Sequence, residues 1–330
     1  MSNMNIHIVT HQHSDGNVRL LTEGWLSHPI RDLRVRVSGG QGYMEPAADF
    51  WQTLPQADAI VLAVTSGPAS AELPRAIELI EEHGKWGHTV LLDYHDSARK
   101  WPYEGVARRV RTAFIGRRYL YERLEDTLPN PVWWPRLGIE RRVLRYAGAL
   151  PWPVWKDKDA ACFYRIYDKA AHRAPWMALA GRLGAMTGTA THGLRHPLYE
   201  RTAGFRHCPN YYELVSRARI GVHLMGGNTA MGYQFWEYAA LGCAILAQHP
   251  SLHPSADIEK AEWEYLGLKE GSEFEYFRTE AEFVAKYRAM ARDPRRCESM
   301  AARVTALVAP YRSVERAAAL YDHLAYCAGE

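Results

Sequence analysis

The chain has 330 residues, of which 47% are hydrophobic and 23% charged, and its formal net charge is +3. This length suits two domains better than one, and the composition is that of an ordinary soluble globular protein. No apolar run approaches the roughly 18 residues that a membrane-spanning helix needs. The chain begins without the features of a signal sequence, and its five cysteines are scattered without CxxC spacing. We therefore expect free thiols and a cytoplasmic location.

The first half of the chain alternates short apolar segments with helical patterns. Such alternation is typical of an open parallel sheet that is covered by helices on both faces. Ligands of these sheets bind beyond the carboxyl ends of the strands. The expected strands are 6–10, 33–37, 59–64, 89–93, 113–115 and 131–134, and the clearest helices are 71–83 and 117–128.

A segment rich in Pro and Trp, 147–155, has neither periodicity and is the best candidate for a linker. The alternation then resumes, and the chain ends in three helical stretches between 279 and 324. Helix starts are marked by capping residues in the pairs Asn210/Glu213, Thr279/Glu282 and Asp293/Pro294. The expected strands are 160–164, 188–192, 220–225, 243–247 and 274–277, and the expected helices include 173–183, 211–217 and 234–241.

These patterns predict an α/β protein with two Rossmann-like parallel-sheet domains that face each other across a cleft. The expected boundaries are 1–150 for the N-terminal domain and 151–330 for the C-terminal domain. The last helix of the chain is a candidate for packing back on the N-terminal domain.

One stretch of the second half joins a strand, a glycine-rich loop and a helix. The loop 226–232 runs into the helix 234–241, so unpaired backbone N–H groups and the positive end of the helix dipole come together. This arrangement suits a phosphate group. Glu237 follows in that helix, where its carboxylate can accept two hydrogen bonds from a ribose diol, and its apolar neighbours predict that it is buried and needs a partner. A diphosphate and a ribose together indicate a nucleotide-sugar.

The same stretch resembles the C-terminal half of GT-B glycosyltransferases, most closely the group 1 and spore-maturation-protein-like families. Those families carry an aromatic-Glu pair five residues before a Gly and a buried strand, which stand here as Trp236-Glu237 and Gly242. A second match is the strand that runs into Arg165 and Lys169, similar to the basic pair that holds the donor diphosphate. The resemblance covers 155–325, and over the first half it is architectural only.

The resemblance implies a donor site in the second domain. Arg165, Lys169 and the glycine loop hold the diphosphate there, Arg173 is a reserve, and Gln234 contacts the sugar or a phosphate. Ordinary readings remain open, with Arg165 as a strand-end arginine directed to solvent and Gln234 as a residue without a site role. The expected donor-binding residues are Arg165, Lys169, Arg173, Gly226, Gly227, Asn228, Thr229, Gln234 and Glu237.

The catalytic base is less clearly marked. Retaining members of the family have a second Glu eight residues before the ribose-binding one, and Thr229 stands at that position here, so the anomeric outcome stays open. An inverting enzyme needs a base for the acceptor proton. Asp15 follows the first strand, and His95 and Asp96 follow the fourth strand at the same sheet edge, so each is a candidate. The simpler alternatives are that Asp15 caps a helix that begins at Asn17 and that Asp96 caps the turn after its strand.

Neither the histidines nor the arginines indicate another chemistry. Histidine pairs such as His11/His13 lack a second ligand set at zinc spacing, and HExxH is absent, so no metal is expected. Arginines between 108 and 145, with tryptophans nearby, are compatible with a groove for an anionic glycan, a lipid-linked precursor or DNA. Acidic residues are interspersed among them, which favours a solvated surface. The small net charge neither requires nor excludes a nucleic-acid partner.

The sequence therefore predicts a metal-independent glycosyltransferase, a hexosyl- or pentosyltransferase that needs no cofactor. It moves a sugar from a nucleotide-sugar, by default a UDP-sugar, to a glycan or small-molecule acceptor. Three alternatives remain open. They are a DNA glycosyltransferase acting on a hydroxymethylated base, a sugar-nucleotide epimerase, and a non-catalytic sugar-nucleotide-binding or scaffold protein.

Overall fold

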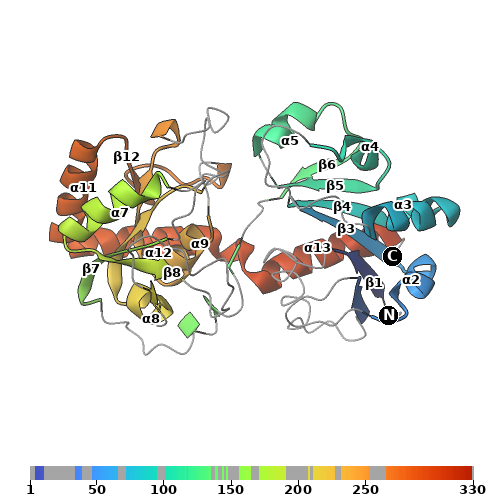
Figure 1. Cartoon of the computed structure of the whole chain (residues 1–330), viewed down its shortest axis with the longest axis horizontal. Coiled ribbons are helices and arrows are strands. Elements are labelled where there is room, and N and C mark those ends of the chain that lie inside the picture. Colours follow the sequence, from blue (N-terminus) through green and yellow to red (C-terminus); the bar gives the residue numbers. More distant parts are fainter. Residues whose placement is uncertain are drawn as a thin grey trace. The chain divides into compact units, whose positions relative to one another are not determined.

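The computed structural model describes the ranges 4–10, 34–38, 47–65, 72–94, 101–116, 118–134, 138–139, 143–144, 146–147, 156–164, 171–190, 207–208, 211–226, 232–252 and 265–328. The chain forms two compact units: unit 1 consists of Met1–Arg141 and Tyr311–Glu330, and unit 2 of Arg142–Pro310. The division therefore lies before the expected boundary at 150, and the last helix belongs to unit 1. Each unit contains a parallel sheet (Figure 1).

The sheet of unit 1 has six parallel strands in the order β2-β1-β3-β4-β5-β6. The chain passes from β1 to β2 on one side and then crosses to β3 on the other, so the order reverses between β1 and β3. The strands are β1 (Asn5–Val9), β2 (Arg34–Val37), β3 (Ala59–Thr65), β4 (Thr89–Tyr94), β5 (Thr112–Ile115) and β6 (Pro131–Trp133).

Helices cover both faces of this sheet because the side chains of each strand alternate between two apolar cores. One core contains Ile6, Ile8 and Val61 and is closed by Leu320 and Leu324 of α13 (Ser313–Ala328). The opposite core is closed by side chains of the other helices that the structure describes in unit 1. These are α2 (Phe50–Thr53), η1 (Leu54–Gln56), α3 (Glu72–Glu82), η2 (Lys85–His88), α4 (Glu104–Ala107) and α5 (Arg118–Leu124).

The C-terminal helix is also tied to unit 1 by hydrogen bonds. Ile139 N–H donates to the Tyr311 carbonyl, and Ser313 N–H donates to the Ile139 carbonyl. Both N···O distances are 3.0 Å. Farther along α13, His323 Nε2 lies 2.8 Å from Thr112 Oγ1 on β5. Apolar packing and these bonds explain why α13 is part of unit 1.

His7 of β1 gives unit 1 a specific sensitivity to acid. Its side chain is 2% exposed, and its Nε2 lies 3.0 Å from Thr53 Oγ1. Burial, with a further contribution from Arg36, lowers the pKa of His7 to about 4. Because the unfolded chain takes up this proton near its ordinary pKa of 6.5, stability is complete above pH 6.5 and falls as the pH drops from 6.5 to 4. The loss from this group is on the order of 3 kcal/mol.

We expect His7→Gln to remove this part of the acid sensitivity. Denaturant unfolding of the wild type and the variant between pH 7.5 and pH 4 measures it. The control is His83→Gln, which replaces an exposed histidine of the same unit and should keep the wild-type slope. Parallel stability curves for His7→Gln and the wild type would contradict this assignment.

The sheet of unit 2 has the parallel order β12-β11-β10-β7-β8-β9. The order reverses between β7 and β10, the point at which Rossmann-like sheets open a crevice at their carboxyl ends. The strands are β7 (Lys158–Phe163), β8 (Met186–Ala190), β9 (His207–Cys208), β10 (Ala218–His223), β11 (Ala244–Gln248) and β12 (Phe274–Phe277).

Two of the predicted helix starts in unit 2 are confirmed. Thr279 Oγ1 accepts from Glu282 N–H at 3.1 Å, and Asp293 Oδ1 accepts from Arg296 N–H at 3.0 Å. Asn210 of the third pair lies outside the described residues. The helices are α7 (Arg173–Arg182), α8 (Tyr211–Ser216), α9 (Tyr233–Ala240), η5 (Pro250–Leu252), α11 (Glu280–Arg292) and α12 (Pro294–Val308), and the chain leaves through η6 (Ala309–Tyr311).

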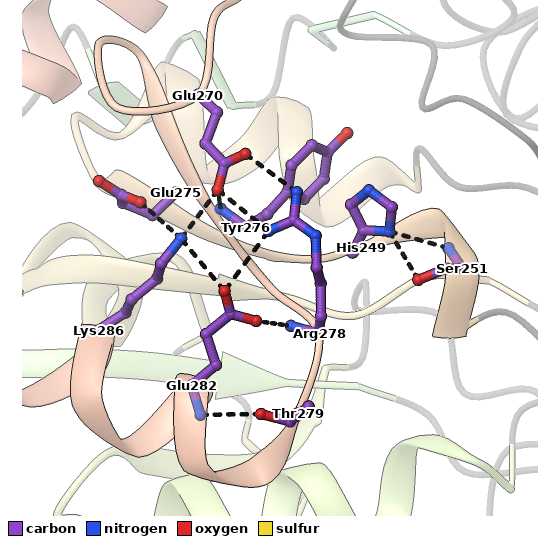
Figure 2. Close-up of polar contacts among 9 residues, drawn as sticks. All are labelled: His249, Ser251, Glu270, Glu275, Tyr276, Arg278, Thr279, Glu282 and Lys286. Carbon is purple, nitrogen blue, oxygen red and sulfur yellow. Dashed lines mark hydrogen bonds and ion pairs between the residues drawn. The ribbon is translucent and has the colours of Figure 1, made fainter.

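Charged side chains cover the outer edge of β12, the last strand of this sheet (Figure 2). Glu270 Oε1 accepts from Tyr276 N–H at 3.4 Å, and Glu282 Oε2 accepts from Arg278 N–H at 2.6 Å. Lys286 Nζ lies 2.8 Å from Glu270 Oε1, which balances the charge of that carboxylate. Backbone donors at this edge are therefore occupied by carboxylates, an arrangement that discourages pairing with a foreign strand.

Candidate functional site

The candidate site lies at the carboxyl end of the unit 2 sheet, where β7 and β10 diverge. Tyr164 follows β7 directly and is fully buried. Its hydroxyl accepts the N–H of Leu224 at 3.0 Å and lies 3.1 Å from the carbonyl of Val222. Burial raises the pKa of Tyr164, which keeps this hydroxyl protonated and able to donate. The end of β10 is thereby held next to the end of β7.

Met225 follows Leu224 and directly precedes the glycine loop. Hydrogen bonds hold both its carbonyl group and its N–H group. Its carbonyl accepts Arg173 Nε at 2.7 Å and lies 3.2 Å from His172 Nε2. Its N–H donates to Gln248 Oε1 at 3.2 Å. Arg173 is 6% exposed, and its Cζ lies 4.8 Å from the centre of the Tyr164 ring. A buried guanidinium is therefore fixed at the start of the loop.

Glu237 of α9 is buried, as its apolar neighbours predicted, with 3% of its surface exposed. Its Oε2 accepts from the Tyr211 hydroxyl at 2.7 Å, and its Oε1 accepts from the Tyr212 hydroxyl at 3.3 Å. Burial and the neighbouring carboxylate raise the pKa of Tyr211, so this phenol remains a donor. The Tyr211 ring packs against the ring of Phe163, the last residue of β7, and the two ring centroids lie 5.6 Å apart. Glu237 therefore lies beside the carboxyl end of β7.

Contacts along α9 fix its position against the sheet. Gly221 of β10 leaves space for Tyr238, whose hydroxyl accepts Phe163 N–H at 3.2 Å. At the far end of the helix, Lys156 Nζ donates to the Leu241 carbonyl at 2.7 Å, where a cation also complements the helix dipole. Gly242 follows the end of the helix with φ of +70°. Glu237 is therefore carried on a helix whose carboxyl half is held against the sheet.

The amino end of α9 lies over His223, the last residue of β10. Gly232 is its N-cap, and a Cβ at Gly232 would lie 3.3 Å from Gln234 Oε1 and 3.9 Å from His223 Cε1. Gln234 therefore lies in the first turn of α9, directly after the loop. The sequence predicted this place in the helix. His223 is fully buried, and its Nδ1 lies 3.2 Å from the Tyr164 hydroxyl. No pattern in the sequence pointed to this residue.

Four predicted donor-binding residues are among the described ones, and all four lie at this end of the sheet: Arg173, Gly226, Gln234 and Glu237. Arg165, Lys169, Gly227, Asn228 and Thr229 lie outside the described residues, as do the candidate bases Asp15, His95 and Asp96. The segments with the candidate bases follow β1 and β4, which are parallel and separated by β3. The carboxyl ends of β1 and β4 therefore lie at the same edge of the unit 1 sheet, roughly 10 Å apart.

A buried carboxylate that the sequence did not single out, Asp93, lies near that edge of unit 1. It is the penultimate residue of β4 and 1% exposed, and its charge helps burial to raise the pKa of Tyr103. The basic surface of unit 1 has ordinary partners: Arg108 pairs with Glu104, and Arg109 pairs with Glu81. For these two arginines the prediction of a solvated, charge-balanced surface is confirmed.

Within the described part of the chain, no group of three or more His, Cys, Asp or Glu side chains is arranged to hold a metal ion. Among those same residues, every helix is too short or too polar to cross a bilayer.

Comparison with known proteins identifies the fold. No protein-family model and no curated protein matches the sequence. A glycosyltransferase from Rickettsia africae ESF-5 matches with a TM-score of 0.63 and 10% identity over 99% of both chains. Anabaena Alr3699/HepE in complex with UDP matches with a TM-score of 0.63 and 10% identity over 98% of this chain and 100% of that one. Its complex with UDP-glucose matches at a TM-score of 0.58, 9% identity, and coverage of 97% and 100%.

A third protein with the same fold is named for a different activity. It is a putative UDP-N-acetylglucosamine 2-epimerase from Listeria monocytogenes, with a TM-score of 0.50 and 10% identity over 97% of this chain and 95% of that one. At such identities the likeness concerns the fold alone. The predicted fold, two Rossmann-like parallel-sheet units of the GT-B type, is confirmed.

Proposed function

We propose that this chain is a glycosyltransferase that moves a sugar from a UDP-sugar to an acceptor hydroxyl. The observation that carries the proposal is the convergence of three groups where β7 and β10 diverge. They are the buried carboxylate of Glu237, the buried guanidinium of Arg173, and the start of the glycine loop at Gly226. Support comes from the shared fold, since Alr3699/HepE was solved with UDP and with UDP-glucose.

In this proposal Glu237 binds the ribose of the donor. An ionised carboxylate offers about four lone-pair sites, and the hydroxyls of Tyr211 and Tyr212 engage it at one oxygen each. Tyr212 is half-buried and makes the longer bond, so it is the partner that yields most easily to a ribose hydroxyl.

The diphosphate binds at the glycine loop and the amino end of α9. As the acceptor oxygen attacks the anomeric carbon, the bond from that carbon to the diphosphate oxygen breaks, and negative charge collects on the leaving UDP. Backbone N–H groups and the charge of Arg173 stabilise it, with Arg165 and Lys169 as further cations, so the reaction needs no metal ion. A base takes the acceptor proton, and Asp15, His95 and Asp96 remain the candidates.

The proposal is tested by incubating the protein with a panel of UDP-sugars, each with and without a set of glycan and small-molecule acceptors. We expect one donor to release UDP much faster when its acceptor is present and to leave its labelled sugar on that acceptor. Calorimetric titration of the same panel measures binding separately. No binding of UDP or of any UDP-sugar would refute the proposal, and binding without turnover would favour a non-catalytic sugar-nucleotide-binding protein.

A sugar-nucleotide epimerase is the second candidate, favoured by the fold shared with the Listeria protein. This activity converts the nucleotide-sugar itself and needs no acceptor, so NMR analysis of the donor incubated alone separates the two. The DNA acceptor has less support, because Arg108 and Arg109 are neutralised by carboxylates. A DNA-acting enzyme would bind DNA with an affinity that falls steeply with salt.

A further inference from the structure

Just beyond the end of β10, the backbone N–H groups donate to side chains instead of to the carbonyls of neighbouring strands. The parallel register between β10 and β11 ends with His223 opposite Ala247. One residue later, Leu224 N–H donates to the hydroxyl of Tyr164 at 3.0 Å. The next N–H, that of Met225, donates to Gln248 Oε1 at 3.2 Å. Backbone donors that leave the sheet here are therefore satisfied from both neighbouring strands, as buried N–H groups must be.

Gln248 is an unusual residue to bury at the end of a strand. It is fully buried, and its Nε2 has no hydrogen-bond partner among the described residues. An apolar side chain of similar size would remove this unpaired donor but would leave the buried N–H of Met225 without its acceptor. The contribution of Gln248 is therefore the acceptor that it offers to the backbone at the start of the glycine loop.

We propose that Gln248 is a positioning residue of the donor site. By holding the N–H of Met225 it fixes the backbone from which the glycine loop starts, without itself touching the donor. Arg173 and His172 hold the carbonyl of the same residue, at 2.7 and 3.2 Å, so the peptide groups on both sides of Met225 are fixed. This inference rests on the proposed function, because it assigns the loop to the diphosphate.

Accurate placement of the loop matters because its amides act on charge that develops as the donor bond breaks. Preorganised donors stabilise such charge only when they already point at the oxygen that carries it. A displacement of about 1 Å costs roughly 100-fold in rate. UDP carries this charge in full, so its affinity reports on loop placement more directly than the affinity for the intact donor.

The test measures the Kd of UDP by calorimetry for wild type, Gln248→Met, Tyr164→Phe and the double variant. Each single substitution removes one acceptor of the backbone and keeps the bulk of the side chain. We expect each to weaken UDP binding about tenfold or more. Because both residues hold the same short segment, the double variant should lose less than the product of the two single factors.

The matched control is Ile245→Val, which trims a buried side chain on the same strand. It should lower the unfolding midpoint and leave the Kd of UDP within about twofold, since additive effects are expected for residues without shared partners. A purely structural role for Gln248 would give the same pattern as this control. The positioning role requires the Kd to change at a temperature where every variant is folded.

The outcomes separate the two proposals. If the wild type binds neither UDP nor a UDP-sugar, the proposed function itself fails. If the wild type binds UDP and Gln248→Met binds it equally well, only the positioning role is overturned. Should Gln248→Met not fold, Tyr164→Phe decides the question, because an unchanged Kd in that variant shows that the backbone of 224–226 does not control the loop.

Discussion

Replacing Glu237 with alanine should weaken the binding of UDP or a UDP-sugar by about 10²- to 10³-fold. In its proposed role the carboxylate accepts two hydrogen bonds from the ribose, and a hydrogen bond to a charged group contributes about 1.5–3 kcal/mol. At the lower end of this range the loss of both corresponds to about 3–4 kcal/mol, and each 1.4 kcal/mol is about tenfold in Kd. Calorimetric titration of the variant with UDP measures the change directly.

The same substitution also affects folding, so a second variant is needed. Alanine leaves the buried hydroxyl of Tyr211 without the acceptor it has at 2.7 Å. Glu237→Gln keeps an oxygen for Tyr211 and removes the charge, so its stability should be closer to that of the wild type while donor binding still falls by about tenfold or more. Glu213→Ala is the control, because Glu213 is an exposed carboxylate on α8 next to Tyr212. Wild-type affinity in a folded Glu237→Ala variant would remove the ribose-binding role.

Much of the fold was predictable because it depends on local patterns. The six strands of unit 1 were all predicted to within two residues, since short apolar runs bounded by polar segments determine a buried parallel strand. Asp293 followed by Pro294 predicted a helix start by its own chemistry and is confirmed. In contrast, α2, α4 and β9 were not predicted, because two to four residues are too short to show a period.

Several boundaries were wrong for a reason that the structure makes clear. Strands were expected at 160–164 and 220–225, and β7 and β10 each begin two residues earlier, at Lys158 and Ala218. Charged residues at these starts resemble loop residues in the sequence. In the structure Arg219 pairs with Asp159 across the two strands at 2.7 Å, so the charges compensate one another within the sheet. Likewise the strand expected at 188–192 is β8, two residues earlier, and the helix expected at 117–128 ends at Leu124.

The candidate site was predictable where one segment contains the whole signal. The apolar neighbours of Glu237 showed that it would be buried and would need a partner, and both are confirmed. The partners themselves, Tyr211 and Tyr212, come from a different helix and could not be named without the strand order. Gln248 and His223 are single polar residues at strand ends, and only the arrangement of β7, β10 and β11 brings them to the glycine loop.

Replacing Gly221 with alanine should lower both the stability of unit 2 and its affinity for the donor. A Cβ at this position would lie 2.5 Å from Cγ and 2.8 Å from Cβ of Tyr238. These atoms are close to the backbone of α9, so no rotation of the ring relieves the clash and the helix itself must move. Overpacking of this kind costs about 1–3 kcal/mol of unfolding free energy. Because Glu237 precedes Tyr238 on the same helix, the displacement moves the carboxylate as well, and UDP binding should weaken by about tenfold or more.

Gly181→Ala provides a control of opposite sign in the same unit. Gly181 lies in α7, and a Cβ there would have no contact closer than 3.5 Å, to the side chain of Thr187. Alanine within a helix is favoured over glycine by about 0.5–1 kcal/mol, so this variant should be slightly more stable than the wild type and bind UDP equally well. Denaturant unfolding and calorimetry on the two variants test the packing argument together. Gly221→Ala could bind UDP like the wild type although its stability is reduced. In that case the packing of α9 against β10 does not determine the position of the Glu237 carboxylate. The donor site then depends on the amino end of α9, where the glycine loop ends.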